Sequence, residues 1–475
     1  MLGLFGALNM AGQSLQTQMA GIEVTGQNLS NVNTTGYTRQ AVDIETSPDI
    51  TTGIGPEGTG AEAVSIQQIT NALLNNQIQG QQSTNGYWNS QQTNLQTIQD
   101  DLDEFLSDAN STSSSTSAST TASSGISTLL TNFFNDAQAV ATSPTSIPAR
   151  QSLISAAQNL ASAFNQINSG FNTAAGNLNT SLSNDVDSAN QLLSNIATLN
   201  QQISVAEFGG GHPNDLIDQQ QQDLKNLAQL TNITTTAGAN GAVNVSIGGQ
   251  SLVSGNQVVD TLQTYDPGNG NLLVQTATGG AHLTLTSGSM QGTIDARDGT
   301  LATLQTDINN LASSFITQVN NVYTAGYGLN DTTGSGLFTG TGASTIGVNT
   351  SLINDPTLFQ AAGSPNSNGD NSVALQLAQL GQNAWASLDN QTFSGYNAQT
   401  VGNFGDALQT ANNQVSNQSV VMNMLTNQQA SVSGVSIDQE MTNLLGFQQA
   451  YEASAELVTT INQLFGDTLA MRTGS

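Results

Sequence analysis

The chain has 475 residues, and its five Lys and Arg face 33 Asp and Glu, which gives a net charge of −28 at pH 7. So few cations exclude a nucleic-acid partner and binding to an anionic lipid surface, because both need clustered Lys and Arg. The absence of cysteine removes disulfides and thiolate metal sites. The sequence contains no run of about 20 apolar residues, so it does not predict a membrane-spanning helix.

The N-terminal segment predicts a helix, because its apolar residues recur at spacings of three and four. They are Leu4, Leu8, Ala11, Leu15, Met19, Ile22 and Leu29. The segment has neither a basic region nor an unbroken apolar core, so it does not read as a cleaved signal peptide.

The same spacing recurs in residues 88–105, 160–203, 304–322 and 408–432, which predicts the long helices of a bundle. One helix over residues 151–206 would be about 84 Å long, so we expect an elongated molecule. Gly170 and Gly176 are the two positions at which that helix would break into two. The Ser/Thr tract at residues 108–125 predicts a flexible loop between helices.

Residues 236–297 change character, because apolar and polar residues alternate in AVNVSIGG, QVVDTLQTY, NLLVQTA and MQGTID. Turn signals such as DPGNG at residues 266–270 separate these runs, which predicts a small antiparallel β domain inserted into the helical body. Residues 327–400 are rich in Gly, Asn and Thr and predict irregular structure around the bundle, with a short helix at residues 372–382.

The C-terminal segment carries a helical stripe wide enough to contact two neighbours. Its members are Ile437, Met441, Leu444, Tyr451, Ala455, Val458, Phe465 and Leu469, flanked by Leu445, Phe447, Leu457 and Ile461. Neither terminal helix buries enough surface to be stable alone, so we expect the two ends to pair with each other, with neighbouring subunits, or with both. The alternative is that both are ordinary core helices of one globule.

These patterns predict a mainly α protein with a β insertion, elongated and multidomain, with paired, coiled-coil-like terminal helices. The predicted parts are a terminal helical assembly domain (1–70 and 430–475), a helical bundle domain (71–235 and 298–429, with the irregular segment 327–400) and an inserted outer β domain (236–297).

Little in the sequence indicates catalysis. Without cysteine and with two histidines, the usual nucleophile and base pairs have almost no candidates. His282 alternates with Leu283 and Leu285, which predicts a solvent-facing strand position, and His212 lies in a glycine-rich loop. We therefore predict no catalytic, metal-binding or cofactor-binding residue, and a protein that is not an enzyme.

Segments near both ends resemble the paired signatures of flagellar axial proteins, the rod, hook and hook-associated families. They are NLSNVNTTGYTR at residues 28–39, and SGVSIDQEM at 433–441 followed by FQQAYEASA at 447–455. Interior segments are similar in order and spacing to the hook-associated members that join hook to filament: PARQ at 148–151, NDLIDQ at 214–219, VSIGGQ at 245–250, ARD at 296–298, GYGLN at 326–330 and GDNS at 369–372. Gln220 and Gln221 depart from that pattern, which favours an Arg-Asp pair.

The signatures and the two apolar stripes together define a predicted assembly interface. Its residues are Leu4, Leu8, Leu15, Met19, Ile22, Leu29, Asn31, Asn33, Gly36, Tyr37, Arg39, Ile437, Met441, Leu444, Phe447, Tyr451, Ala455, Val458, Ile461, Phe465 and Leu469.

The resemblance implies a structural subunit that is exported unfolded by the flagellar type III system and becomes extracellular, with a dedicated export chaperone masking its C-terminal helix. It implies a homo-oligomeric helical ring that contacts the hook protein and a second junction protein, hook-associated protein 3. Three alternatives remain open: another axial component such as hook or rod, a secreted adhesin that uses residues 236–297, and an enzyme such as a peptidoglycan hydrolase.

Overall fold

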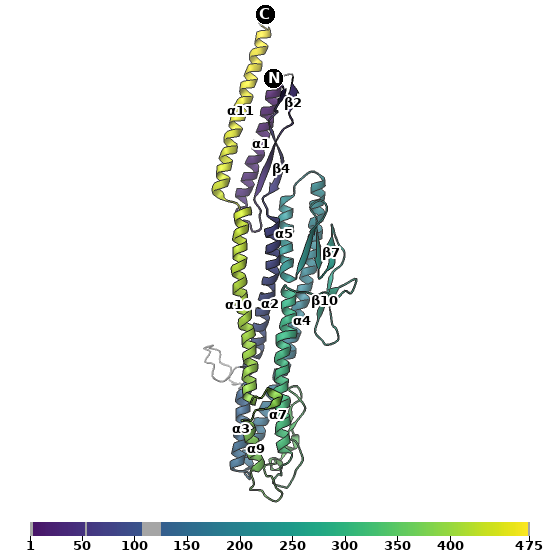
Figure 1. Ribbon diagram of the computed structural model, residues 1–475, viewed down its shortest axis with the longest axis vertical. Helices are drawn as coiled ribbons and strands as arrows, with labels where there is room; N and C mark the ends of the chain where they lie inside the picture. The colour runs from purple at the N-terminus through teal and green to yellow at the C-terminus, as the bar shows by residue number, and fades with distance from the viewer. Residues whose placement is uncertain (1–2, 53–54, 107–124, 474–475) are drawn as a thin grey trace.

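The computed structural model describes residues 3–52, 55–106 and 125–473, which form one long rod with both chain ends at the same end of the rod (Figure 1). The prediction of an elongated, mainly α fold with small antiparallel sheets is confirmed. Most of the predicted Ser/Thr loop at residues 108–125 lies outside the described residues.

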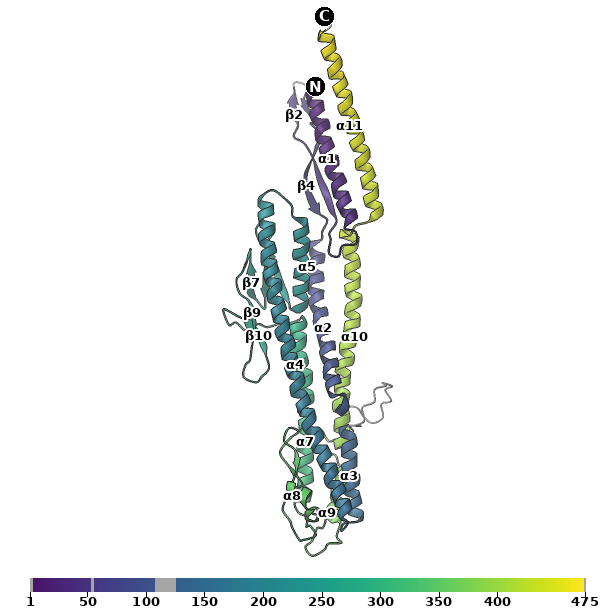
Figure 2. The ribbon, with the colours of Figure 1, turned by 180° about the vertical axis from the view of Figure 1, so that it is seen from behind.

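The terminal part of the rod is a pair of helices with a β-ribbon beside it. Helices α1 (Leu4–Ser30) and α11 (Ile437–Thr473) lie side by side in both views (Figures 1 and 2). The ribbon pairs β1 (Gln40–Thr46) with β4 (Ala61–Gln68), and β2 (Ile50–Thr52) with β3 (Gly55–Glu57), both antiparallel. The segment predicted as part of a terminal helical assembly domain, residues 1–70, therefore also contains a β-ribbon that was not predicted.

The body of the rod is a bundle of helices, most of them long. They are α2 (Ala72–Leu106), α3 (Ile126–Thr142), α4 (Ile147–Phe208), α5 (Asn214–Leu230), α6 (Ser289–Asp295), α7 (Ala302–Tyr323) and α10 (Phe393–Ser433). Helix α10 leads directly into α11, and α2 packs against both α10 and α5.

Helix α4 sets the length of the body, because its 62 residues form one continuous helix of about 93 Å. It begins where the Ser146 side chain accepts a hydrogen bond from the Ala149 amide, with Pro148 in the first turn. Gly170 and Gly176 do not interrupt it, since a stripe of buried residues from Leu153 to Ile203 holds the helix against its neighbours.

The far end of the rod holds the largest apolar core. Short elements cover it, namely β11 (Phe338–Thr339), β12 (Gly347–Val348), α8 (Thr350–Asn354), η2 (Pro356–Leu358), α9 (Ser372–Leu380) and η3 (Ala386–Leu388). At its centre the ring of Phe315 lies 5.2 Å from Phe133, 5.2 Å from Phe338 and 5.4 Å from Phe393. Segments distant in sequence thus meet in one aromatic cluster.

The outer β region lies beside α4. A four-stranded sheet has the order β5 (Ile233–Ala237), β6 (Val243–Ile247), β7 (Gln250–Ser254) and β8 (Gln257–Val258), and β9 (Leu262–Tyr265) pairs with β10 (Leu273–Thr276). The sequence MQGTID was wrongly expected to be a strand, because Met290 to Asp295 belong to α6. The Met290 side chain is fully buried, and Gly292 lies against the Tyr87 carbonyl of α2.

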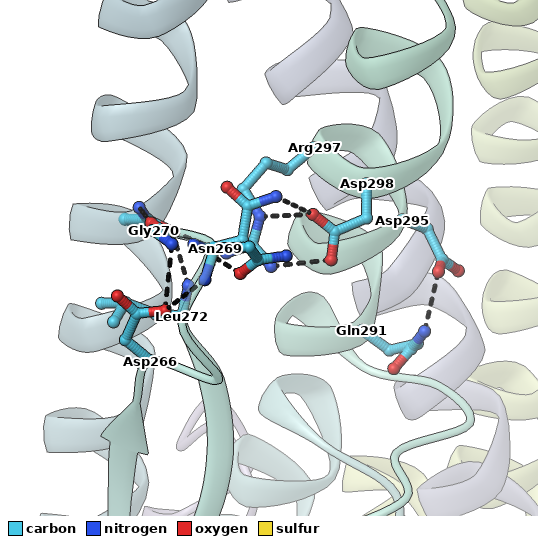
Figure 3. Close-up of polar contacts among 10 residues, drawn as sticks. Asp266, Asn269, Gly270, Leu272, Gln291, Asp295, Arg297 and Asp298 are labelled. Carbon is cyan, nitrogen blue, oxygen red and sulfur yellow. Dashed lines mark hydrogen bonds and ion pairs between the residues drawn. The ribbon is translucent and has the colours of Figure 1, made fainter.

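Figure 3 shows how a buried arginine fixes the β9–β10 hairpin to the body. Arg297 lies in a π-helical turn (Ala296–Leu301) and is 1% exposed. Its guanidinium donates to both carboxylate oxygens of Asp298 at 2.8 Å and to Asn179 of α4 at 2.6 Å. Asn271 donates to Asp298, and the Leu272 amide donates to Asn179, so the hairpin and α4 share one network.

We predict that Phe315→Ala lowers the free energy of unfolding by about 3–5 kcal/mol, because it opens a cavity at the centre of the aromatic cluster. Urea denaturation followed by circular dichroism measures the loss. Phe208→Ala is the matched control, since Phe208 is 88% exposed and its truncation should cost less than about 0.5 kcal/mol. Equal losses from the two variants would contradict the assigned core.

Candidate assembly interface

The turn after α1 is organised around one buried amide, that of Asn28. Its nitrogen donates to the Gln40 carbonyl at 2.8 Å and to Glu440 at 3.1 Å. Its oxygen accepts from the Tyr37 hydroxyl at 2.9 Å and from the Gln40 amide at 2.9 Å. Both donor hydrogens and both acceptor positions of the amide are therefore used. Gly36 makes the turn possible with a φ of +85°.

Glu440, in the first turn of α11, joins the C-terminal helix to this turn. It is 1% exposed, and its second carboxylate oxygen accepts from Arg39 Nε at 2.7 Å. The Arg39 amide also donates to the Ser433 carbonyl at the end of α10, at 2.9 Å. We call Asn28, Tyr37, Arg39, Gln40 and Glu440 the terminal clamp, because they hold α1, β1 and α11 together.

A second set of bonds attaches the clamp to the body through α5. The amide and hydroxyl of Thr38 donate to the Asp218 carboxylate at 2.9 Å and 2.6 Å, and Gln68 donates to it at 2.9 Å. Asn214, at the start of α5, donates to the Ile66 carbonyl of β4 at 3.0 Å. The segment NDLIDQ thus fixes the base of the terminal part to the body.

Burial shifts the pKa values of two groups here. Burial, followed by the negative charges of Asp215, Asp218 and Glu440, raises the pKa of Tyr37 to about 12. The phenol therefore stays protonated and donates to Asn28 at neutral pH. Burial also raises the pKa of Asp218, against the hydrogen bonds from Thr38 that lower it.

Above the clamp, α1 and α11 pack along one face. The Ser14 and Ser454 hydroxyl oxygens are 3.0 Å apart, and the rings of Phe5 and Phe465 are 4.8 Å apart. At Gly21 an added Cβ would lie 2.7 Å from the ring of Phe447, so the helices approach closely because this position has no side chain.

The predicted interface residues divide into three groups. The first group is buried or half-buried in the two terminal helices. It consists of Leu4, Leu8, Leu15, Ile22 and Leu29 from α1, and of Leu444, Phe447, Tyr451, Ala455, Val458, Ile461 and Phe465 from α11. The second group is half-buried in the turn after α1 and consists of Asn31, Tyr37 and Arg39. The third group is exposed and consists of the remaining six residues, Met19, Asn33, Gly36, Ile437, Met441 and Leu469. The structure thus brings the first two groups together within one chain and leaves the third open.

Helix α11 exposes two apolar stripes outside its α1-facing side. The lower stripe is Ile437, Met441 and Leu445, exposed by 51%, 43% and 54%, and the upper stripe is Leu457, Leu464 and Met471, exposed by 42%, 48% and 77%. At 100° per residue the stripes lie roughly 110° to either side of the α1-facing side. They therefore form two surfaces at different heights along the helix.

Sequence reasoning missed Asn28, Gln40 and Glu440 as interface residues, although the signatures contain two of them. Thr38, Asp218 and Asn214 were missed as well. A polar residue beside an apolar stripe resembles a solvent-facing one in the sequence, and Asn28 and Glu440 are 412 positions apart. One sequence signal could have indicated these residues. Uncharged or acidic polar residues lie at the edge of the apolar stripe of each terminal helix, next to the residues predicted to be in the interface.

The described residues contain neither a metal-binding cluster nor a membrane-spanning helix. No group of three or more His or acidic side chains there is arranged to hold a metal ion. No helix in the same residues is both long and apolar enough to cross a membrane.

The chain is similar to several flagellar proteins. A model of the flagellar hook-associated protein FlgK helical domain matches residues 113–338, and a model of the flagellar basal body rod FlgEFG protein C-terminal region matches residues 427–471. Flagellar hook-associated protein 1 of Bacillus subtilis (strain 168) is 27% identical, over 98% of this chain and 97% of its own. The protein of that name from Escherichia coli (strain K12) is 22% identical, over 98% and 99%.

The flagellar hook junction protein FlgK from Burkholderia pseudomallei shares the fold, with a TM-score of 0.63 and 18% identity over 75% of this chain and all of that one. Together with the sequence matches, this elongated helical fold indicates a structural protein of the flagellar axial type. The chain is similar to flagellar hook-associated protein 1 over nearly its whole length, and it is a structural component of the bacterial flagellum.

We predict that Gly21→Ala loosens α11 from α1, because the new methyl group overlaps the Phe447 ring at a cost of about 1–3 kcal/mol. Hydrogen exchange of α11 amides should rise about fivefold or more.

Gly26→Ala is the matched control on the same helix, since nothing lies within 4 Å of its added Cβ, and it should stabilise α1 by up to about 1 kcal/mol. The double variant Gly21→Ala/Phe447→Ala should recover part of the protection. Equal exchange in the two single variants would refute the close contact.

We predict that Glu440→Gln opens the terminal clamp, because it removes the charge of a buried partner of Arg39 at a cost of about 1.5–3 kcal/mol. Trypsin provides the measurement, since the chain has five basic residues and cleavage after Arg39 requires local opening. When opening is fast, the cleavage rate follows the open population, so the rate should rise about 10- to 100-fold.

Cleavage after Arg150, buried at the far end of the rod, is the internal control and should not change. A variant cleaved after Arg39 at the wild-type rate would show that Glu440 does not hold the clamp closed.

Proposed function

We propose that the chain forms the junction between the hook and the filament, as a helical ring of identical subunits that associate through their terminal helices. The observation that supports this most directly is the pair of exposed apolar stripes on α11. In water such surfaces favour association, at roughly 25 cal/mol for each Å² buried. Two stripes on opposite flanks suit a subunit with a neighbour on each side.

The charge of the chain supports apolar contacts between subunits. Copies with a net charge of −28 repel each other, so contact surfaces made of Leu, Ile and Met avoid bringing carboxylates together. The lower and upper stripes are free of charged side chains, and they alternate along α11 with Gln, Thr and acidic residues that face other directions.

The partners follow from the resemblance and from the names of the relatives. We infer that the ring contacts the hook protein on one side and hook-associated protein 3 on the other. The chain is exported unfolded through the flagellar type III system, and a cytoplasmic chaperone covers the stripes of α11 before export. The assembled protein is extracellular and has no catalytic role.

A hook or rod role is the alternative, since the match at residues 427–471 is to a rod-type C-terminal model. The terminal unit therefore does not distinguish the junction from other axial positions. The match of residues 113–338 to the helical domain of the hook-associated protein favours the junction, as do relatives aligned over nearly their full length.

We predict that Leu457→Glu/Leu464→Glu, as the cell's only copy, gives finished hooks without filaments and filament subunits in the medium. Two carboxylates in the upper stripe prevent its burial without disturbing the α1-facing side. Electron microscopy and immunoblots of the medium give the readout.

The matched control is Gln449→Glu/Gln463→Glu, which adds the same charge at exposed positions of α11 away from the α1-facing side, and it should retain filaments. Cells lacking the chain should show the same hooks without filaments. If those cells lack hooks instead, the protein belongs to the hook or rod, and if they keep normal flagella, an axial role is excluded.

A further inference from the structure

A cleft of about 470 Å³ opens where the terminal part meets the body. On one side it is lined by Gly36, Tyr37 and Thr38 of the turn and by the end of α10. On the other side it is lined by α2, α5 and the first strands of the outer sheet. Its walls therefore belong to both parts, and any group bound in it would contact both.

Lys225 of α5 lines this cleft, and its ammonium has little compensation. The nearest partner given by the structure is the Gln429 side-chain oxygen at 3.5 Å, the outer limit for a hydrogen bond. No described carboxylate lies within ion-pair distance of it. Burial lowers the pKa of Lys225, and the negative charge of Asp218 opposes that shift. A partly buried cation without a close anion is unfavourable unless a partner arrives.

The other described cations are already engaged. Arg39 pairs with Glu440, and Arg297 pairs with Asp298. Arg150 donates to the carbonyls of Pro144 and Phe359. The structure describes the side chains of four basic residues, Arg39, Arg150, Lys225 and Arg297. Among these four, Lys225 is therefore the one that lines open space and has no anion within ion-pair distance.

The rest of the lining suits a carboxylate-bearing peptide. Asp218 is the one acidic residue among the lining residues, and both of its oxygens already accept bonds from Thr38 and Gln68. Amide side chains such as Asn76 and Gln221 supply N–H donors for a carboxylate and acceptors for a peptide backbone.

We propose that this cleft receives an acidic side chain from a neighbouring copy of the same chain, whose carboxylate pairs with Lys225. The inference rests on the proposed ring, which places copies side by side. Charge complementarity favours a second copy, since each copy carries 33 Asp and Glu. Because the walls come from both parts of the rod, occupation fixes the angle between the terminal helices and the body.

The test uses flagella assembled with a single-cysteine variant, which is clean because the natural chain has no cysteine. Gln222→Cys places a thiol on the exposed rim of the cleft, where a benzophenone maleimide is attached. Irradiation should give covalent dimers of this chain, and mass spectrometry should locate the cross-link in a peptide of the second copy that contains Asp or Glu.

Adding Lys225→Gln should lower the dimer yield about fivefold or more, whereas Lys225→Arg should retain most of it. Gln201→Glu changes the net charge as Lys225→Gln does, but at an exposed position of α4, and it should leave the yield unchanged. Circular dichroism of each purified variant checks that its helix content is intact.

Cross-links to hook protein, to acid-free peptides, or within one chain would overturn the proposal, as would yields that Lys225→Gln does not change. In those cases the chain would still be detected in purified flagella by immunoblot, and the proposed function would stand. Absence of the unsubstituted chain from flagella would instead overturn the proposed function, and this inference with it.

Discussion

The carboxylate of Glu440 holds together segments from the two ends of the chain. It is buried, and it accepts from Arg39 of the N-terminal turn and from Asn28 of α1. A buried carboxylate without such partners would be strongly unfavourable. The first turn of α11 is therefore fixed at the position where Glu440 reaches Arg39 and Asn28. The direction of α11, and with it the position of both exposed stripes, depends on this bond and on the fully used amide of Asn28.

Elsewhere in the rod, two of the few basic residues also connect segments that are distant in sequence. Arg150, 1% exposed, connects the α3–α4 turn to Phe359 in the irregular distal segment, and Arg297 connects the β9–β10 hairpin to α4. With Arg39, three of the five basic residues join segments distant in sequence. Arginine suits this use because its planar guanidinium donates in several fixed directions and keeps its charge when buried.

The long helices could be predicted because each buries a continuous stripe, as α4 does from Leu153 to Ile203. The spacing of apolar residues did not predict the secondary structure of short segments. The spacing in MQGTID fits both a strand and a helix, and this segment is helical because it packs against α2. The β1–β4 ribbon was missed, although its strands pair along their whole length and both pack on α1. In the interface, the apolar residues could be predicted from their spacing. Which of them face α1 could not, since α11 is apolar on three flanks.

Pairing of the two ends of one chain is the central claim, and a designed disulfide tests it most directly. Ser14→Cys/Ser454→Cys replaces hydroxyls whose oxygens lie 3.0 Å apart, in a chain without other cysteines. We predict that mild oxidation of assembled flagella gives a bond within each subunit, so that the denatured chain runs as a monomer before reduction. Covalent dimers through this pair would show that each α1 pairs with the α11 of another subunit, which would contradict the account.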